Sequence, residues 1–167
     1  MKVKPDPRDV VLSTVVAEHR PFEDSIQIVR EKRSGKDAAF AVSFEDRDGV
    51  QRRGLIGLCH HHGGVWQPSG GFIGSARVVE DRAVWMTWGG WGPATTKERA
   101  AAGGWLADPS TAAARLFDPM GRVLEDVAEN GVVIFMWKGD FDDSHARLEL
   151  LDEDQRVIRT GPMRRSR

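Results

Sequence analysis

The chain has 167 residues, of which 40% are hydrophobic and 29% charged, and its formal net charge at pH 7 is -1. This length suits one domain that buries a core without disulfides, and the small net charge argues against nonspecific binding of nucleic acid. The single cysteine, Cys59, excludes an internal disulfide framework. No segment approaches the roughly 18 apolar residues that span a membrane, and the start of the chain does not resemble a signal peptide. We therefore expect a cytoplasmic protein, with residues 1–160 as one β domain and 161–167 as a basic flexible tail.

Apolar and polar residues alternate along most of the chain, and this period of two predicts β-strands. In chain order, the expected strands are Val10–Glu18, Ser25–Glu31, Ala38–Glu45, Val50–Cys59, Gly71–Val79, Ala83–Trp88, Ala112–Phe117, Val123–Ala128, Val132–Trp137, Ala146–Leu151 and Arg156–Thr160. The segment Phe22–Lys32 is ambiguous, because Ile26 and Val29 have helical spacing whereas Ile26 and Ile28 have strand spacing. We favour a strand there.

Acidic turns separate several of the predicted strands. The same order of strand, acidic turn and strand recurs at Phe40–Arg53, Ala114–Asp126 and Ala146–Thr160. Aspartate at the start of such a turn accepts hydrogen bonds from nearby backbone N–H groups, and Gly49 or Gly121 supplies the positive φ that reverses the chain. Asn130-Gly131, which precedes an apolar run, is the strongest single hairpin signal in the chain.

One short helix is expected near residues 95–102. Thr95 and Glu98 have the spacing of a capping box, in which each side chain accepts a hydrogen bond from an N–H group at the start of the helix. The alanines that follow favour helix, and Gly103 and Gly104 would end it.

These elements predict an all-β fold, a mostly antiparallel β-sandwich or barrel-like structure with about 9–11 strands and one short helix. The segments ARLFDPMGRVLED and ARLELLDEDQRVIRT resemble the hairpins of β-sandwich modules of the immunoglobulin or transthyretin type. The resemblance implies a fold class and no particular activity.

The run His60-His61-His62 is the first candidate site. On an extended segment His60 and His62 would lie on one face, where they could supply two ligands of a transition-metal site. The third ligand would come from His145, His19 or a carboxylate within Asp140–Asp143. The alternative is that the three histidines are solvent-exposed polar residues at the end of a strand.

Catalytic groups are not assembled in any recognisable pattern. Cys59 is expected to be a small buried residue, because on a strand the adjacent His60 lies on the opposite face and cannot act as its base. The acidic loop Asp140–Asp143 lacks the spacing of a calcium loop and is expected to be a solvated hairpin tip. The sequence therefore favours a protein that is not an enzyme, with no cofactor beyond the hypothetical metal.

Tryptophan and glycine are concentrated in His60–Pro93, which holds four of the six tryptophans. The segment Gly89–Pro93 cannot be the interior of a regular strand, so it would expose backbone and the Trp91 ring together. Aromatic rings displayed in this way suit a ligand or protein contact. The candidate binding residues are Trp66, Trp88, Trp91 and Trp105. The alternative is that most of the tryptophans fill the core.

Three functional hypotheses follow. The leading one is a non-enzymatic binding or interaction module whose loops rich in glycine and tryptophan contact a partner protein or a small ligand. The second is a small metal-binding protein or metal-dependent enzyme that uses His60 and His62 with His145. The third is an assembly subunit in which exposed strands pair between copies of the chain. Nucleic acid and membranes are not expected partners under any of the three.

Overall fold

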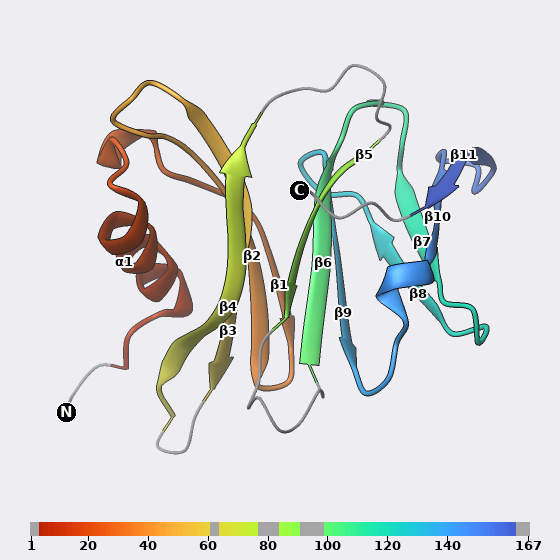
Figure 1. Ribbon diagram of the computed structural model, residues 1–167, viewed down its shortest axis with the longest axis horizontal. Helices are drawn as coiled ribbons and strands as arrows, with labels where there is room; N and C mark the ends of the chain where they lie inside the picture. Colours follow the sequence, from red (N-terminus) through yellow and green to blue (C-terminus); the bar gives the residue numbers. More distant parts are fainter. Residues whose placement is uncertain (1–3, 61–63, 77–83, 91–98, 163–167) are drawn as a thin grey trace.

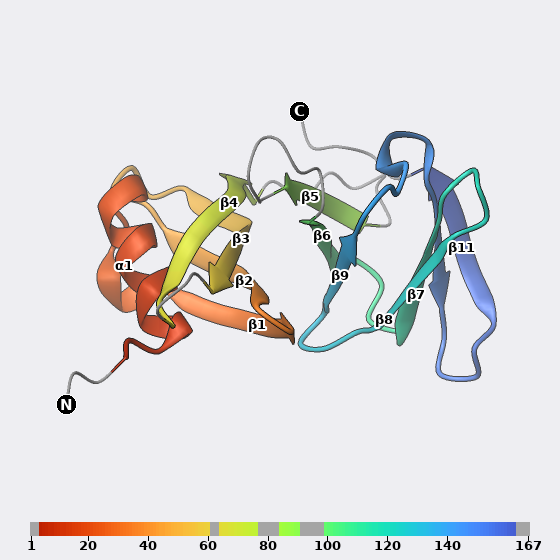
Figure 2. The ribbon, with the colours of Figure 1, turned by 90° about the horizontal axis from the view of Figure 1, so that it is seen from below.

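Three antiparallel β-sheets and one α-helix are stacked in four layers (Figure 1). The computed structural model describes residues 4–60, 64–76, 84–90 and 99–162, with residues 84–90 and 99 described by their backbone alone. The helix covers the outer face of the first sheet, the middle sheet lies against the inner face, and the third sheet closes the far end (Figure 2). The prediction of a mostly antiparallel all-β fold is confirmed.

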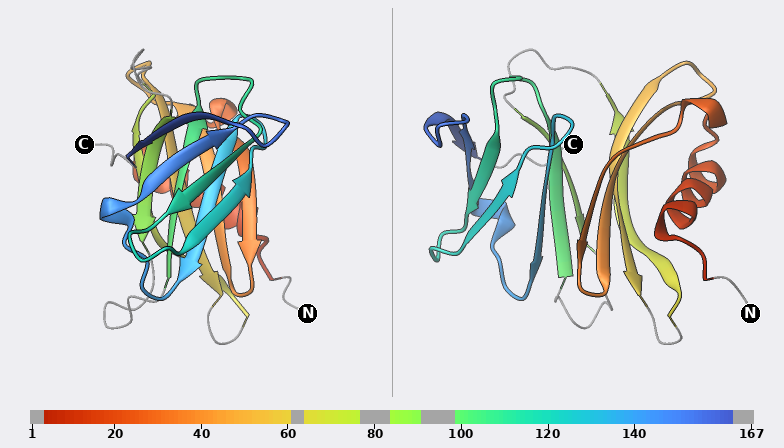
Figure 3. Two further views of the ribbon diagram at one scale, coloured as in Figure 1. Left: turned by 90° about the vertical axis from the view of Figure 1, so that its right-hand side faces the viewer. Right: turned by 180° about the vertical axis from the view of Figure 1, so that it is seen from behind.

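The first sheet is a meander of four strands in the order of the chain: β1 (Gln27–Ser34), β2 (Asp37–Glu45), β3 (Gln51–His60) and β4 (Trp66–Ser75). The middle sheet has the order β5-β6-β9, with β5 (Val84–Gly90), β6 (Arg99–Leu106) and β9 (Val132–Lys138). The third sheet has the order β11-β10-β7-β8, with β7 (Ala113–Phe117), β8 (Val123–Val127), β10 (Arg147–Leu151) and β11 (Val157–Pro162). Its strands run obliquely across those of the layers behind it (Figure 3). Short 3₁₀ turns, η1 (Glu23–Ser25) and η2 (Asp143–His145), precede β1 and β10.

The α-helix of the described chain is α1 (Pro7–His19), which corrects the predicted strand at Val10–Glu18. The Asp6 side chain accepts a hydrogen bond from the backbone N–H of Arg8, and Pro7 follows at the first helical turn, which is a standard helix start. Val11 and Val15 lie one helical turn apart and are fully buried against the first sheet. The valines are therefore part of a helix, and the signal for its start, Asp6-Pro7, precedes the apolar run.

Alternate residues of β2 enter two different cores. Phe40, Val42 and Phe44 pack toward α1, whereas Ala39 and Ala41 pack toward the middle sheet. The large side chains fill the wider space beneath the helix, and the alanines allow the two sheets to approach closely. In β2, which is buried on both faces, large and small apolar residues alternate in place of apolar and polar ones.

The short helix expected near residues 95–102 is wrong over residues 99–102, which begin β6; residues 95–98 lie outside the described part of the chain. Ala101 packs into the core shared with the first sheet, and Ala102 packs into the core shared with the third sheet. Both faces of β6 are packed against other sheets, so tertiary packing overrides the helix propensity of alanine here.

The acidic turns form as predicted. Asp46 Oδ1 accepts hydrogen bonds from the backbone N–H groups of Asp48 and Val50, at 3.0 and 2.9 Å. In the turn between β10 and β11, Asp152 Oδ1 accepts hydrogen bonds from the backbone N–H groups of Asp154 and Arg156, at 2.9 Å each. These repeated Asx turns join neighbouring strands at the ends of the sheets.

Asn130-Gly131 forms the tight hairpin expected from its sequence. Both residues have positive φ, 53° and 72°, and Glu129 and Val132 exchange backbone hydrogen bonds at 3.0 Å. This turn leads from β8 in the third sheet into β9 in the middle sheet. It also delivers the Asn130 side-chain amide to the backbone oxygen of Val29 in the first sheet, at 2.9 Å.

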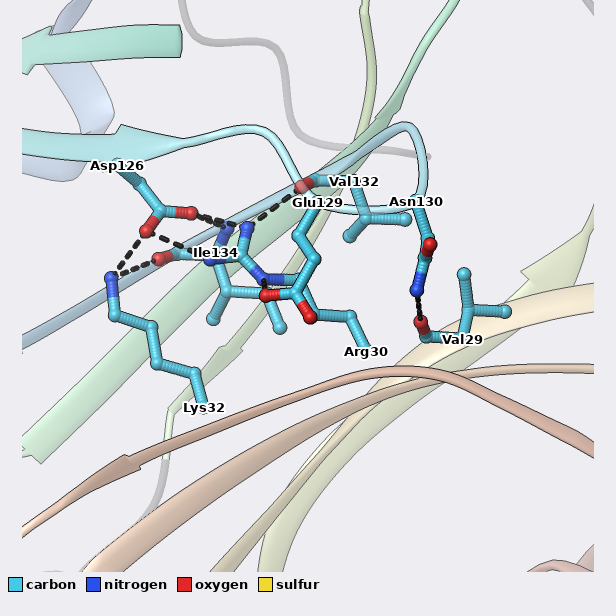
Figure 4. Close-up of polar contacts among 8 residues, drawn as sticks. All are labelled: Val29, Arg30, Lys32, Asp126, Glu129, Asn130, Val132 and Ile134. Atoms are coloured by element: carbon cyan, nitrogen blue, oxygen red, sulfur yellow. Dashed lines mark hydrogen bonds and ion pairs between the residues drawn. The ribbon is translucent and has the colours of Figure 1, made fainter. Parts of the chain in front are cut away.

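A buried ion pair joins the first sheet to the third (Figure 4). A β-bulge between Ile28 and Arg30 shifts the register of β1 against β2, and the Arg30 side chain is 7% exposed. Its guanidinium donates to both carboxylate oxygens of Asp126 on β8, at 2.5 and 3.0 Å. Lys32 donates to the same carboxylate at 2.7 Å.

The same cluster also includes the backbone of the middle sheet. Arg30 donates to the backbone oxygen of Val132 at 2.7 Å, and Lys32 donates to that of Ile134 at 2.8 Å. Asp126 accepts from the backbone N–H of Ile134 at 2.7 Å. The Asp126 carboxylate, on the third sheet, is therefore hydrogen-bonded to both the first and the middle sheet. Two cations, Arg30 and Lys32, form ion pairs with it (Figure 4).

Replacing Asp126 with Asn should lower the free energy of unfolding by about 3–5 kcal/mol, because it removes the carboxylate charge that pairs with Lys32 and with the buried Arg30, and leaves Arg30 only the exposed Glu129 at 3.6 Å. Urea denaturation of both proteins measures this difference. The matched control is Glu125→Gln on the same strand, whose exposed pair with Arg115 should contribute at most about 1 kcal/mol. Arg30→Met should lower the free energy of unfolding less in an Asp126→Leu background than in the wild type. Equal stability of wild type and Asp126→Asn would contradict the role of the cluster.

Gly54 on β3 should not tolerate even one added methyl group. A Cβ there would collide with the backbone oxygen of Phe72 and with the Ile73 side chain on β4. We expect Gly54→Ala to lower the free energy of unfolding by about 1–3 kcal/mol or more in urea denaturation. Gly161→Ala on β11 is the control, because its Cβ would meet no atom within 4 Å. Equal effects of the two substitutions would contradict the close approach of β3 and β4.

Candidate functional site

A depression of about 450 Å³ is lined by the C-terminal end of α1 and the turn between β2 and β3. Figure 1 shows these two parts of the chain at the same end of the first sheet. Its lining combines three carboxylates, three guanidinium groups, a histidine and two apolar side chains: Glu18, His19, Arg20, Phe44, Asp46, Arg47, Asp48, Arg52 and Ile73. Residues from the helix, the β2–β3 hairpin and β4 therefore meet at one place on the surface.

Backbone contacts fix the segment that follows α1. Arg20, which ends the helix, has a left-handed conformation with φ 47°, a conformation that costs free energy in residues other than glycine. The chain then pairs with the end of β2: Pro21 forms an isolated bridge with Asp46, and the backbone N–H of Phe22 donates to the oxygen of Glu45 at 2.9 Å. Arg20 is thus held next to the β2–β3 turn despite its distance from it in sequence.

Asp46 organises the other side of the depression. One carboxylate oxygen accepts from two backbone N–H groups of the turn, and the other accepts from Arg52 Nε at 2.7 Å. Gly49 completes the turn with φ 75°. Because its two oxygens are engaged in three hydrogen bonds, Asp46 acts as a structural support for Arg47 and Arg52.

These hydrogen bonds also set the acidity of Asp46. The backbone N–H of Val50 has the largest effect and the Arg52 side chain the next; together they hold the pKa of Asp46 below its ordinary value, against the opposing effect of burial. The carboxylate is therefore ionised at neutral pH and keeps its bond to Arg52.

The inner side of the depression is apolar. Phe44 is 1% exposed and packs in the core beneath α1, and the half-buried Ile73 lies against the same core. The His19 ring lies over Phe44 with ring centroids 5.8 Å apart, so an aromatic surface continues from the core to the depression. A ligand could rest an apolar group on this surface.

Two of the lining arginines have no partner among the residues that the structure describes. Arg20 and Arg47 are exposed and form no ion pair or side-chain hydrogen bond with any other residue in the described ranges. Glu18, by contrast, lies 3.8 Å from His19 Nε2 with 65% of its side chain exposed. Charged groups that are positioned by the backbone yet unpaired in the protein are suited to contact with a ligand.

Two of the three histidines predicted to bind metal, His60 and His145, are not brought together. His60 ends β3 in the first sheet, where its ring lies 5.0 Å from that of Trp66, and His145 lies in η2 beside the third sheet, with the middle sheet in between. His62 lies outside the described residues. Within the described residues there is no group of three or more histidine, cysteine, aspartate or glutamate side chains that could hold a metal ion.

His145 has another contact. Its Nδ1 lies 2.8 Å from Asp142 Oδ2, while Asp142 Oδ1 accepts from the backbone N–H groups at the start of η2. The bond to His145 is the main cause that lowers the pKa of Asp142. The acidic loop at Asp140–Asp143 is thus an ordered, capped turn.

The candidate tryptophans lie on different surfaces. Trp66 packs with the core beneath α1, next to the Arg33 guanidinium at 6.0 Å, whereas Trp105 packs with the core between the first and middle sheets, 5.5 Å from that of Arg53. Trp66, on β4, and Trp105, on β6 of the middle sheet, pack on opposite sides of the first sheet and do not form one platform. Trp88 is described only by its backbone, which pairs with Ala102, and Trp91 lies outside the described residues.

Sequence reasoning missed Arg20, Arg47 and Arg52. The sequence predicted the hairpin turn at Asp46. Nothing in the spacing of the arginines indicates that the chain after α1 pairs with this turn. The one available signal was the helix start at Asp6-Pro7, which would have placed Arg20 at a helix end.

The chain matches no known protein-family model, and a search of curated proteins finds no significant similarity. In the described part of the chain, no helix combines the length and apolar character needed to cross a membrane. Any assignment of function therefore depends on the geometry of the molecule itself.

The lowered pKa of Asp46 predicts how stability depends on pH. A carboxylate whose pKa is lower in the folded than in the unfolded state stabilises the protein above about pH 4 and loses this effect as the pH falls through the folded-state pKa. Asp46→Ala should therefore be less stable than wild type at pH 7, and the difference should shrink as the solution is acidified. Chemical denaturation at a series of pH values measures it.

Asp48→Ala is the matched control for this prediction, because Asp48 is in the same turn but its exposed side chain accepts no hydrogen bond within the described structure. A difference between wild type and Asp46→Ala that is independent of pH would show that the carboxylate charge does not stabilise the turn.

Proposed function

We propose that this protein is a non-enzymatic binding protein that holds a small polar ligand in the depression between α1 and the β2–β3 turn. The observation that carries the proposal is the pair Arg20 and Arg47: they come from two distant parts of the sequence, line one depression and have no partner among the described residues. Charged side chains gathered in this way stabilise a bound polar molecule more than they stabilise the fold.

The size of the depression agrees with such a ligand. Its volume of about 450 Å³ lies within the range of small-molecule sites, which is roughly 300–1,000 Å³. Ile73 and the His19 ring that covers the buried Phe44 provide an apolar surface, and the surrounding charges provide directional contacts. This combination of one apolar wall and several polar groups is typical of sites that fix the orientation of a ligand.

The site is also arranged in advance of binding. The Pro21–Asp46 bridge and the three hydrogen bonds of Asp46 hold the two loops that carry the arginines. A ligand that enters therefore orders side chains and not backbone, which lowers the entropic cost of binding.

The binding module predicted from the tryptophans and the metal-binding alternative remain separate hypotheses. The first includes Trp88 and Trp91 beside Trp66 and Trp105, and the second includes His62 beside His60 and His145; the side chains of Trp88, Trp91 and His62 lie outside the described structure. The depression offers a binding site formed entirely by described residues.

A fragment screen tests the proposal. The isotopically labelled full-length protein would be titrated with small anions, cations, zwitterions and neutral molecules while backbone amide signals are followed by NMR. We expect at least one class to cause saturable shifts of residues 18–20, 44–48 and 52. His19→Trp should abolish these shifts, because the larger ring fills the space above Phe44.

Val16→Trp is the control, since Val16 is on the same helix, is 37% exposed and does not line the depression. The shifts should persist in this variant. No saturable shift with any class of compound, or shifts that survive His19→Trp, would overturn the proposal.

A further inference from the structure

The charges that line the depression are balanced. Three carboxylates, Glu18, Asp46 and Asp48, face three guanidinium groups, Arg20, Arg47 and Arg52. A ligand that carries only one sign of charge would meet as many repulsive as attractive groups in this site. The net charge of the lining therefore gives neither an anion nor a cation an advantage.

Two of the six groups already neutralise each other. Asp46 and Arg52 form an ion pair at 2.7 Å, and the Asp46 carboxylate is only 11% exposed. The groups left for a ligand are two cations, Arg20 and Arg47, and two anions, Glu18 and Asp48; each element, the end of α1 and the β2–β3 turn, contributes one of each. None of these four forms an ion pair with another of the four in the described structure.

The C-terminal end of α1 also favours a positively charged group in the depression. The C-terminal end of a helix carries partial negative charge on backbone oxygens without helical partners, which favours a nearby cation. Glu18 and His19 form the last turn of α1, so this negative end and the Glu18 carboxylate lie together at one side of the depression. Arg47 comes from a different element, the β2–β3 turn.

From this arrangement we propose that the ligand is a small zwitterion with an apolar side group, of the size and kind of a free α-amino acid. Its ammonium group is held by Glu18 and the end of α1, its carboxylate by Arg47, and its apolar group rests on Ile73 and on the His19 ring that covers Phe44. Guanidinium groups suit this role because they bind a carboxylate through two parallel hydrogen bonds. This inference rests on the proposed function and specifies its ligand class.

Four related compounds separate the contributions of the two charges. L-Leucine has both charges, N-acetyl-L-leucine has only the negative one, L-leucinamide only the positive one, and N-acetyl-L-leucinamide has neither. Calorimetric titration of the full-length protein should show that L-leucine binds at least about tenfold more tightly than each of the others, because each lost charge leaves charged protein groups unpaired.

Variants of the protein assign each charge to its partner. In Arg47→Gln, the preference for L-leucine over L-leucinamide should disappear, while the preference over N-acetyl-L-leucine remains. Glu18→Gln should have the opposite effect. The matched controls Arg115→Gln and Glu125→Gln, which remove exposed charges on the third sheet, should leave all four affinities unchanged.

The outcomes distinguish the two proposals. Equal binding of all four compounds, or tightest binding of a compound with one charge or none, overturns the zwitterion inference but leaves a small-molecule site at the depression. An unaltered preference for L-leucine in both Arg47→Gln and Glu18→Gln also overturns it. Absence of binding by the four compounds, together with a fragment screen that produces no saturable shifts, overturns both proposals.

Discussion

The buried pair between Arg30 and Asp126 is the interaction on which the arrangement of the layers depends. The three sheets share apolar cores, but apolar contacts are not directional and tolerate small sliding movements. The Asp126 carboxylate accepts hydrogen bonds from side chains of the first sheet and from the backbone of the middle sheet, so it fixes the relative positions of three layers at once. The bulge in β1 that precedes Arg30 is what allows a charged residue to enter this interior position.

The candidate site lies on the first sheet, away from this cluster, and is supported by local bonds. Phe44 belongs to both the core beneath α1 and the depression, so packing of the helix against β2 determines the shape of the site. The charged rim is held by turn hydrogen bonds of Asp46 and by pairing of the chain after α1 with the end of β2. A stable core and an independently braced rim together allow charged groups to stay unpaired at the surface.

Much of the β architecture could be predicted from sequence, because alternation and turn chemistry are local. VVIFMW and ARLEL have a clear period of two, and Asn130-Gly131 specifies its hairpin. Two elements could not be predicted from the same signals. The valines of α1 favour a strand by propensity but form a helix, and Ala100–Ala102 favour a helix but form part of β6. In both segments, packing against the neighbouring layers determines the structure. The site could not be predicted for a related reason. Arg20 and Arg47 are brought to one depression by the bridge between Pro21 and Asp46, a nonlocal contact with no sequence pattern.

The strand order implies a sequence of events in folding. The first sheet is a meander whose neighbouring strands are consecutive in the chain, so its contacts can form early at low cost in loop entropy. The middle sheet is interrupted: β7 and β8 of the third sheet lie in the chain between β6 and β9, which are neighbours in space. Its last strand must therefore return from the third sheet through the Asn130-Gly131 hairpin, and we expect closure of the middle sheet to be coupled to formation of the third.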